Sequence, residues 1–256
     1  MSLLADMARS SAERARHPRM GDFAGTRAVP SFEAPALIAE VKLAAPSVGT
    51  LQAPDDPLAF VVEQARRYAR AGASAISVLT ERLRFHGDLS YLQAVAEAVD
   101  VPVMRKDFLV DPVQLDEAST HGASMVLLIA RMLDDAILEA MGQRADELGL
   151  VVLLEAFDAE DLKRSAVFAA RHPRTLVGVN TRDLVTLEVV SDRLARLTPH
   201  LPDLPAPRRV AESGIRTVED ARAARAAGYG SALVGSALMT ADDPESFARQ
   251  LIEALQ

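Results

Sequence analysis

Several charged side chains follow short apolar segments of this chain, at the points where buried strands would finish. Lys42, Lys106 and Glu155 are the clearest, and Glu40 and Glu212 occupy equivalent places. Further strand ends carry Thr80, Glu81, Arg105 and Arg131. The interior of a buried strand stays apolar, because an unpaired charge there costs several kcal/mol. Charges that occur only at strand ends therefore indicate one shared polar site. Lysines and glutamates with pKa values pushed apart can serve there as general acid and general base.

The pair Glu40 and Lys42 carries a further signal in its spacing. The two residues are two positions apart on a predicted strand, so both side chains point to the same side. A carboxylate and an ammonium group side by side stabilise each other's charged form. By itself this pair is equally consistent with a structural ion pair. The other charged residues and Asn180 also stand at the ends of predicted strands, which favours a catalytic cluster over a structural ion pair.

The elements that must hold these residues recur as strand–helix units. The predicted strands span residues 37–39, 75–79, 101–104, 124–129, 150–154, 176–179, 209–212 and 232–234. The predicted helices span residues 57–71, 89–99, 112–120, 134–148, 158–170, 191–197, 217–227 and 244–255. Such alternation implies parallel strands joined by crossover helices. Eight units in about 220 residues match an α/β fold of the (β/α)8 TIM barrel type better than an open sheet.

The first part of the chain does not show this alternation of strands and helices. We predict an N-terminal extension over residues 1–35, with one helix at 2–16 and a loop at 21–35. Residues 36–256 are predicted to form the catalytic barrel domain.

Two glycine-containing loops follow the last two predicted strands. The loop after the seventh strand contains Ser213 and Gly214, and the loop after the eighth contains Gly235 and Ser236. Glycine allows backbone N–H groups to approach an anion closely, and these two loops are the usual phosphate site of such a barrel. Phosphate binding is therefore favoured over ordinary tight turns.

Composition narrows the class of protein. The chain has 256 residues, a net charge of −8 and no cysteine, which excludes disulfides and cysteine-ligated zinc. Its histidines show no metal-ligand spacing, and its acidity argues against nucleic-acid binding. The longest apolar stretch, 125–130, is too short for a bilayer. Asp6 interrupts the N-terminus before any signal-like segment, so a cytoplasmic location is expected.

Six motifs occur in order on the predicted strands and the loops that follow them. They are Ile38-Ala-Glu-Val-Lys42 with Pro46-Ser47, Ser77-Val-Leu-Thr-Glu81, Val101-Pro-Val-Met-Arg-Lys-Asp-Phe108, Val177-Gly-Val-Asn-Thr-Arg-Asp-Leu184, Ala211-Glu-Ser-Gly-Ile215 and Leu233-Val-Gly-Ser-Ala-Leu-Met239. From residue 38 to residue 256 the chain resembles the indole-3-glycerol phosphate synthase family. The resemblance implies conversion of 1-(2-carboxyphenylamino)-1-deoxyribulose 5-phosphate into indole-3-glycerol phosphate, carbon dioxide and water, in tryptophan biosynthesis. It implies neither a cofactor nor a metal.

The resemblance also assigns roles to residues of this chain. Lys106 resembles the general acid that protonates the ribulose carbonyl, and Glu155 resembles the acid/base residue of the dehydration. Lys42 resembles the lysine that binds the substrate carboxylate, with Glu40 and Glu212 as supporting carboxylates. The remaining expected substrate contacts form an apolar wall at Phe108, polar ligands near the anthranilate and a phosphate cradle. These residues are Ser47, Phe108, Asn180, Arg182, Ser213, Gly214, Gly235 and Ser236.

Three loops depart from the family pattern. The usual Lys-Arg-x-Ser-Pro-Ser is replaced by residues 42–47 with Leu43 and Ala45, Asp88 stands where serine is usual, and Phe157 where histidine is usual. These departures leave open a paralogue acting on a modified anthranilate adduct. Another phosphosugar enzyme, such as an isomerase, and a non-catalytic barrel that binds a phosphate ligand are further alternatives.

The expected partner is a small phosphosugar, with no nucleic acid and no membrane. A monomer and association with other enzymes of the pathway both remain open.

Overall fold

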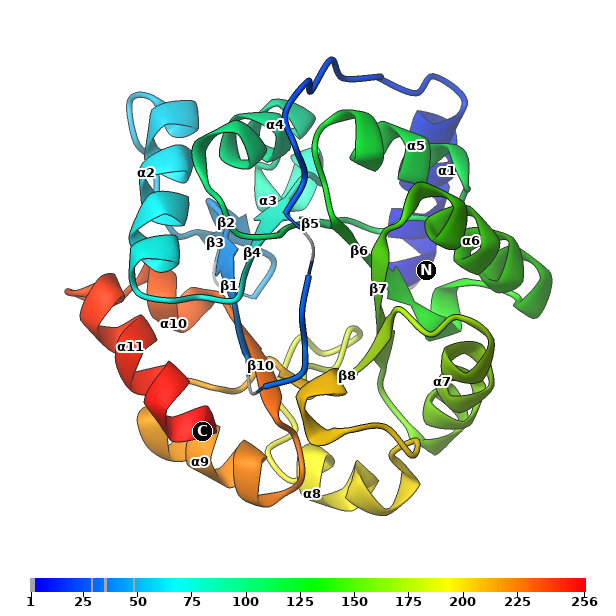
Figure 1. Cartoon of the computed structure of the whole chain (residues 1–256), viewed down its shortest axis with the longest axis vertical. Coiled ribbons are helices and arrows are strands. Elements are labelled where there is room, and N and C mark those ends of the chain that lie inside the picture. Colours follow the sequence, from blue (N-terminus) through cyan, green and yellow to red (C-terminus); the bar gives the residue numbers. More distant parts are fainter. Residues whose placement is uncertain (1–2, 29, 35, 48) are drawn as a thin grey trace.

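The computed structural model describes residues 3–28, 30–34, 36–47 and 49–256. Its centre is a closed barrel of parallel strands with helices around it (Figure 1). The barrel strands are β1 (Ala36–Val41), β4 (Ala75–Leu79), β5 (Val103–Lys106), β6 (Met125–Ile129), β7 (Val151–Ala156), β8 (Thr175–Asn180), β9 (Arg209–Glu212) and β10 (Ser231–Val234). They pair in chain order, and β10 closes the barrel on β1. The predicted TIM barrel is confirmed.

Helices follow the strands and cover the outside of the barrel. They are α2 (Pro57–Arg70), α4 (Leu89–Ala98), α5 (Val113–Thr120), α6 (Asp135–Leu148), α7 (Ala159–Arg171), α8 (Arg193–Leu197), α9 (Val218–Ala226) and α11 (Pro244–Leu255). Most begin at a residue whose side chain accepts a hydrogen bond from a backbone N–H of the first turn. These caps are Asp56, Asp88, Asp134, Asp158, Thr217 and Asp243.

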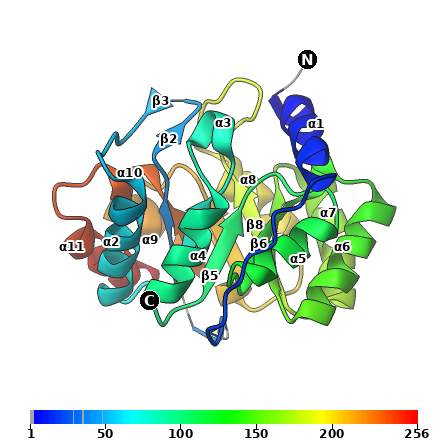
Figure 2. The same cartoon turned by 90° about the horizontal axis from the view of Figure 1, so that it is seen from above.

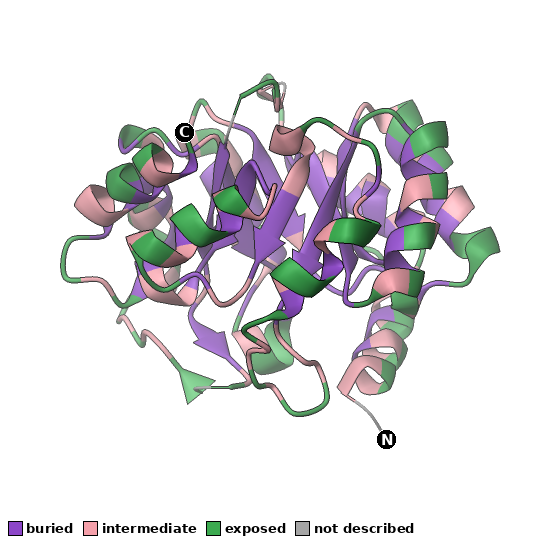
Figure 3. Cartoon of the chain, turned by 90° about the horizontal axis from the view of Figure 1, so that it is seen from below, coloured by how far each residue is buried: buried purple, intermediate pink, exposed green. Residues whose placement is uncertain are grey.

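Alternation along each strand separates two apolar layers. In β1, Leu37 and Ala39 pack against the helices, whereas Ile38 belongs to the cluster inside the barrel. Figure 3 shows that the strands of the barrel are mostly buried. Because successive side chains point to opposite faces, Glu40 follows Ile38 into the barrel interior. The same alternation carries Lys106 inward after Met104.

Short elements absent from the predicted pattern surround the carboxyl ends of the strands (Figure 2). They are the antiparallel pair β2 (Ala44–Ala45) and β3 (Gly49–Thr50), and the helices α3 (Arg82–Phe85) and α10 (Ser236–Met239). Single 3-10 turns span Ala130–Met132, Thr198–His200 and Ala206–Arg208. None of these was expected, because elements of two to four residues carry no periodic signal.

The prediction placed the third strand too early. It expected residues 101–104, whereas β5 begins at Val103 and includes Arg105 and Lys106. Pro102 has no N–H to donate to a strand ladder, and a polar residue at the end of a barrel strand remains in the sheet when its side chain reaches the polar mouth. Glu155 and Asn180 likewise belong to β7 and β8.

The N-terminal helix α1 (Leu3–Ala15) lies at the same end of the barrel as β2, β3 and α3 (Figure 2). The chain then runs along the barrel to its opposite end before β1 begins. Residue 2 of the predicted helix and residues 29 and 35 of the predicted loop lie outside the described residues. The division at residue 35 stays a prediction. No helix among the described residues has the length and apolar character required to cross a membrane.

Candidate active site

A cavity of about 370 Å³ opens at the carboxyl ends of the strands. Every residue predicted to act on or bind the substrate lies along its wall. These residues are Glu40, Lys42, Ser47, Lys106, Phe108, Glu155, Asn180, Arg182, Glu212, Ser213, Gly214, Gly235 and Ser236. They come from distant parts of the chain and are brought together because parallel strands end at the same edge of the barrel.

Lys106 lies between two buried carboxylates in this cavity. Its Nζ is 3.4 Å from Oε2 of Glu155 and 3.8 Å from Oε2 of Glu212. Asn180 Nδ2 donates to the other oxygen of Glu155 at 3.1 Å. The amide therefore fixes the Glu155 carboxylate in an orientation that leaves its second oxygen facing the ammonium group.

The second lysine has its own carboxylate. Lys42 Nζ is 2.6 Å from Oε1 of Glu40, as the spacing of the two residues predicted. Burial acts to raise the pKa of Glu40, but Lys42 and Lys106 lower it below its ordinary value. Glu40 is therefore ionised, and it holds the Lys42 ammonium group in place at the mouth.

Lys106 and Glu212 both have pKa values raised above their ordinary values. Burial acts to lower the pKa of Lys106, but Glu155, Glu212 and Glu40 raise it above its ordinary value. Burial, together with the nearby charge of Glu155, raises the pKa of Glu212 well above its ordinary value. Lys106 therefore keeps its proton, and the Glu212 carboxyl binds a proton more tightly than an ordinary carboxyl does, beside a space that a substrate can enter.

Two glycines make room for the buried carboxylates. A Cβ at Gly178 of β8 would overlap Oε1 of Glu212, and one at Gly235 would overlap Oε1 of Glu40. The Gly235 Cβ would also lie 2.9 Å from Nζ of Lys42. Gly235 was predicted for phosphate binding, and in the structure its lack of a side chain also makes room for Glu40 and Lys42.

We expect Gly178→Ala to destabilise the fold by about 1–3 kcal/mol, because the added methyl group overpacks the barrel interior against Glu212. Thermal unfolding measures the change. The same substitution should cost less in a Glu212→Ala background, where the overlapping carboxylate is absent. An equal cost in both backgrounds would contradict this explanation.

The predicted phosphate loops lie side by side, because β9 and β10 pair through Glu212 and Leu233. Ser213 and Gly214 have φ angles of 62° and 75°, in the left-handed region. Serine rarely adopts this conformation, and such strain is concentrated at functional sites. Ser213 and Gly214 line the cavity beside Gly235.

Part of the cavity wall is apolar. Phe108 lies with its ring centre 6.1 Å from that of Phe85. Both rings line the cavity, along with Leu3 of α1 and Leu184 and Leu187 of the loop after β8. The cavity thus combines a charged end with an aromatic and aliphatic wall, which suits a ligand that is anionic at one part and aromatic at another.

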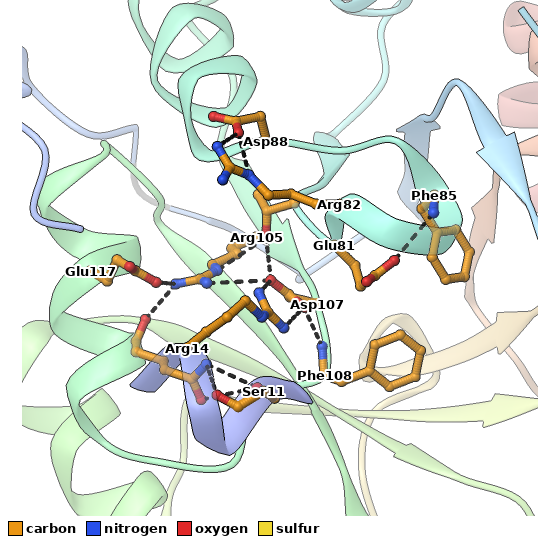
Figure 4. A network of polar contacts seen from close by, with 12 residues as sticks. Ser11, Arg14, Glu81, Arg82, Phe85, Asp88, Arg105, Asp107, Phe108 and Glu117 are labelled. Atoms are coloured by element: carbon orange, nitrogen blue, oxygen red, sulfur yellow. Dashed lines mark hydrogen bonds and ion pairs between the residues drawn. The ribbon is translucent and has the colours of Figure 1, made fainter. Parts of the chain in front are cut away.

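Several charged strand ends that were expected to share the site lie elsewhere. Arg105 points outward from β5 and its side chain is 1% exposed, with Nη1 2.7 Å from Oε2 of Glu117 (Figure 4). Its Nε donates to the hydroxyl of Thr80 at 3.2 Å. The prediction was wrong for Arg105, whose side chain lies on the outward face of β5, and for Thr80, which follows β4 and donates its hydroxyl to Asp107.

Glu81 and Arg131 are also outside the cavity. The Glu81 carboxylate caps α3 by accepting from the backbone N–H groups of residues 83–85. Arg131 lies 4.5 Å over the ring of Phe157 and 2.6 Å from Oδ2 of Asp161. Both residues stabilise loops at the mouth and do not reach the space that a ligand would occupy.

A family model described as indole-3-glycerol phosphate synthase matches residues 8–251. Indole-3-glycerol phosphate synthase of Mycolicibacterium vanbaalenii is 46% identical over 86% of this chain and 77% of that protein. The protein of the same name from Parafrankia sp. is 44% identical over 85% of this chain and 78% of its own length. The chain belongs to the indole-3-glycerol phosphate synthase family.

Solved structures share the architecture of this family member at much lower identity. The 3-hexulose-6-phosphate synthase of Salmonella typhimurium superposes with a TM-score of 0.67 at 16% identity, over 86% of this chain and 98% of that one. Another 3-hexulose-6-phosphate synthase gives a TM-score of 0.65 at 18% identity, over 86% of this chain and 99% of that one. These similarities concern the fold alone.

This member of the indole-3-glycerol phosphate synthase family has cavity residues that sequence reasoning missed. They include Leu3, Phe85, Leu187 and Arg216. Leu3 precedes the repeating units, Phe85 ends the four-residue helix α3, and Leu187 and Arg216 lie in loops, so no local pattern distinguished them. Among the described residues, no three His, Asp or Glu side chains are grouped so as to hold a metal ion.

The raised pKa of Glu212 leads to a pH prediction for this family member. Between the ordinary value of 4.5 and its raised value, the folded protein keeps a proton that the unfolded chain releases. Its contribution to stability is therefore lost as pH rises through this interval. We expect Glu212→Gln, which needs no proton, to gain stability relative to the unmodified protein as pH rises above 4.5.

Thermal unfolding from pH 4 to pH 8 checks the Glu212 prediction. Glu253→Gln is the matched control, because Glu253 is exposed on α11. A Glu212→Gln difference that does not change with pH would show that folding does not shift the pKa of this carboxyl.

Proposed function

We propose that the protein is a carboxy-lyase that converts 1-(2-carboxyphenylamino)-1-deoxyribulose 5-phosphate into indole-3-glycerol phosphate. The observation that carries this proposal is the convergence of Lys42, Lys106 and Glu155 at one cavity of a chain that belongs to this family. The substrate has a carboxylate, an aromatic ring and a phosphate. The cavity offers cations, an apolar wall and two glycine-containing loops for these groups.

Ring closure requires an acid at the ribulose carbonyl. The ring carbon that bears the carboxylate attacks this carbonyl, and Lys106 donates a proton to its oxygen as the new carbon–carbon bond forms. Carbon dioxide then leaves, and its bonding electrons restore the aromatic ring. Lys106 suits this step because the carboxylates of Glu155 and Glu40 help to keep its ammonium group protonated.

Dehydration completes the indole. The new hydroxyl group leaves as water, with a proton lost from the neighbouring methylene carbon. Glu155 acts as the acid/base group of this step, and Asn180 holds it in orientation. Lys42, held by Glu40, binds the substrate carboxylate before it is lost.

Substrate binding is shared among the remaining cavity residues. Phe108 packs against the aromatic ring, and Arg182 and Ser47 contribute polar contacts at the mouth. Arg182 is held by donation from Nη1 to the carbonyl of Leu187 at 2.7 Å. The phosphate lies against the loops of residues 213–214 and 235–236, where backbone N–H groups are the natural ligands.

Purified protein mixed with the carboxyphenylamino ribulose phosphate tests this function. Appearance of indole fluorescence, with release of one carbon dioxide per product molecule, is the expected result. Binding of the adduct without any product would contradict the proposal and favour a non-catalytic barrel.

The departures in the loop after β1 keep one substrate question open. Ala45 lines the cavity where serine is usual, whereas Leu43 is buried in the layer beneath the helices. Asp88 forms ion pairs with Arg82 and Arg19 outside the cavity, so its charge does not face the substrate. A ring substituent near Ala45 is the modification that this geometry favours. Turnover of plain and ring-substituted adducts, compared directly, tests it.

A further inference from the structure

Helix α1 is joined to the end of β5 by a bidentate ion pair. Arg14 Nη1 donates to Oδ2 of Asp107 at 2.7 Å, and Nη2 donates to Oδ1 at 2.8 Å (Figure 4). Asp107 stands directly between Lys106 and Phe108, both of which line the cavity. A residue of the N-terminal extension thus holds the backbone segment that carries the proposed general acid.

The Asp107 carboxylate is fully buried and fully engaged. Besides Arg14, it accepts from the Thr80 hydroxyl at 2.7 Å, from Arg105 Nη2 at 3.3 Å and from the backbone N–H of Phe108 at 2.8 Å. Burial acts to raise the pKa of Asp107, but Arg14 and Arg105 hold it well below its ordinary value. The carboxylate is therefore a permanent charge that fixes the angle at which the chain leaves β5.

Helix α1 contributes to the cavity itself. Leu3 lines the wall, and Met7 is buried in the same apolar cluster as Phe108. A second polar contact joins Gln114 Nε2 to the hydroxyl of Ser11 at 2.9 Å. Helix α1 is thus joined to the segment 106–108 by a charged contact and to α5 by a neutral one.

We propose that Arg14 is a positioning residue that acts through Asp107 to set the placement of Lys106 and Phe108. A bidentate charge-assisted pair fixes orientation more strictly than a single hydrogen bond. A misplacement of about 1 Å in a catalytic group can reduce rate about 100-fold. The inference rests on the proposed function, since Lys106 is taken as the acid.

Arg14→Met is the direct test. The variant should fold, because Asp107 keeps Arg105 and Thr80 as partners. We expect kcat to fall about tenfold or more as Lys106 loses its alignment, and KM to rise as the apolar wall loosens. Arg14→Lys should give an intermediate kcat, because the ammonium group keeps the charge next to Asp107 but cannot form the bidentate hydrogen bond.

Arg16→Met is the matched control. Arg16 follows α1 and forms an exposed ion pair with Glu13 at 2.8 Å, away from the cavity. Exposed pairs of this kind contribute little. We expect kcat and KM within about twofold of the unmodified protein.

Hydrogen exchange supplies a readout that needs no turnover. The backbone N–H of Phe108 is protected by its bond to Asp107, so exchange over residues 106–109 should speed up in Arg14→Met and not in Arg16→Met. This result supports the inference even if the unmodified protein fails to turn over the adduct. Unchanged exchange over this segment in Arg14→Met, or unchanged kcat in an active enzyme, would overturn it.

Discussion

Replacing Lys106 by methionine should lower kcat by about 10²–10⁴-fold, the usual contribution of a general acid. Methionine keeps most of the side-chain volume and removes the ammonium group that faces Glu155 and Glu212. Substrate binding should change less than kcat, because the carbonyl gains its proton only in the transition state. Initial rates from indole fluorescence give the two parameters.

Lys163→Met is the matched control for Lys106, because Lys163 is exposed on α7. It should retain full turnover.

Lys106→Met should also lose stability as pH rises, since the lysine normally lowers the pKa of Glu212 and its removal raises that pKa further. Full turnover of the Lys106 variant would exclude it as the acid and favour a different phosphosugar reaction.

Glu155→Gln should lower kcat by a similar factor, about 10²–10⁴-fold, while the site keeps its shape. The amide fills the space of the carboxylate and retains an oxygen that accepts from Asn180. It cannot exchange a proton, so the dehydration is the step that should slow. Rapid-quench measurement should show the hydroxylated, decarboxylated intermediate accumulating before indole appears.

Glu160→Gln provides the comparison for Glu155, because Glu160 is exposed in the first turn of α7. Its turnover should be unchanged. An intermediate that accumulates in Lys106→Met and not in Glu155→Gln would reverse the two proposed assignments.

The sequence determined the units of the barrel and the main members of the polar cluster. Apolar segments of three to six residues separated by helical patterns have few packing solutions, so the parallel barrel followed from periodicity. Lys42, Lys106 and Glu155 were recognisable because a charged side chain at the end of a buried strand requires a polar environment. Glu40 was paired with Lys42 by a spacing of two, which is a property of any strand.

Only the tertiary structure decided which charged strand ends meet. Arg105 and Lys106 are adjacent in sequence and opposite in orientation, and a prediction error of one position along the strand exchanges their roles. The space for Glu212 depends on Gly178 of the neighbouring strand, and the wall at Leu3 depends on where α1 docks. The contact of Arg14 with Asp107 spans 93 positions. Such contacts are set by barrel closure and helix docking. These bring together residues that are far apart in the sequence, so no local pattern predicts which of them will meet.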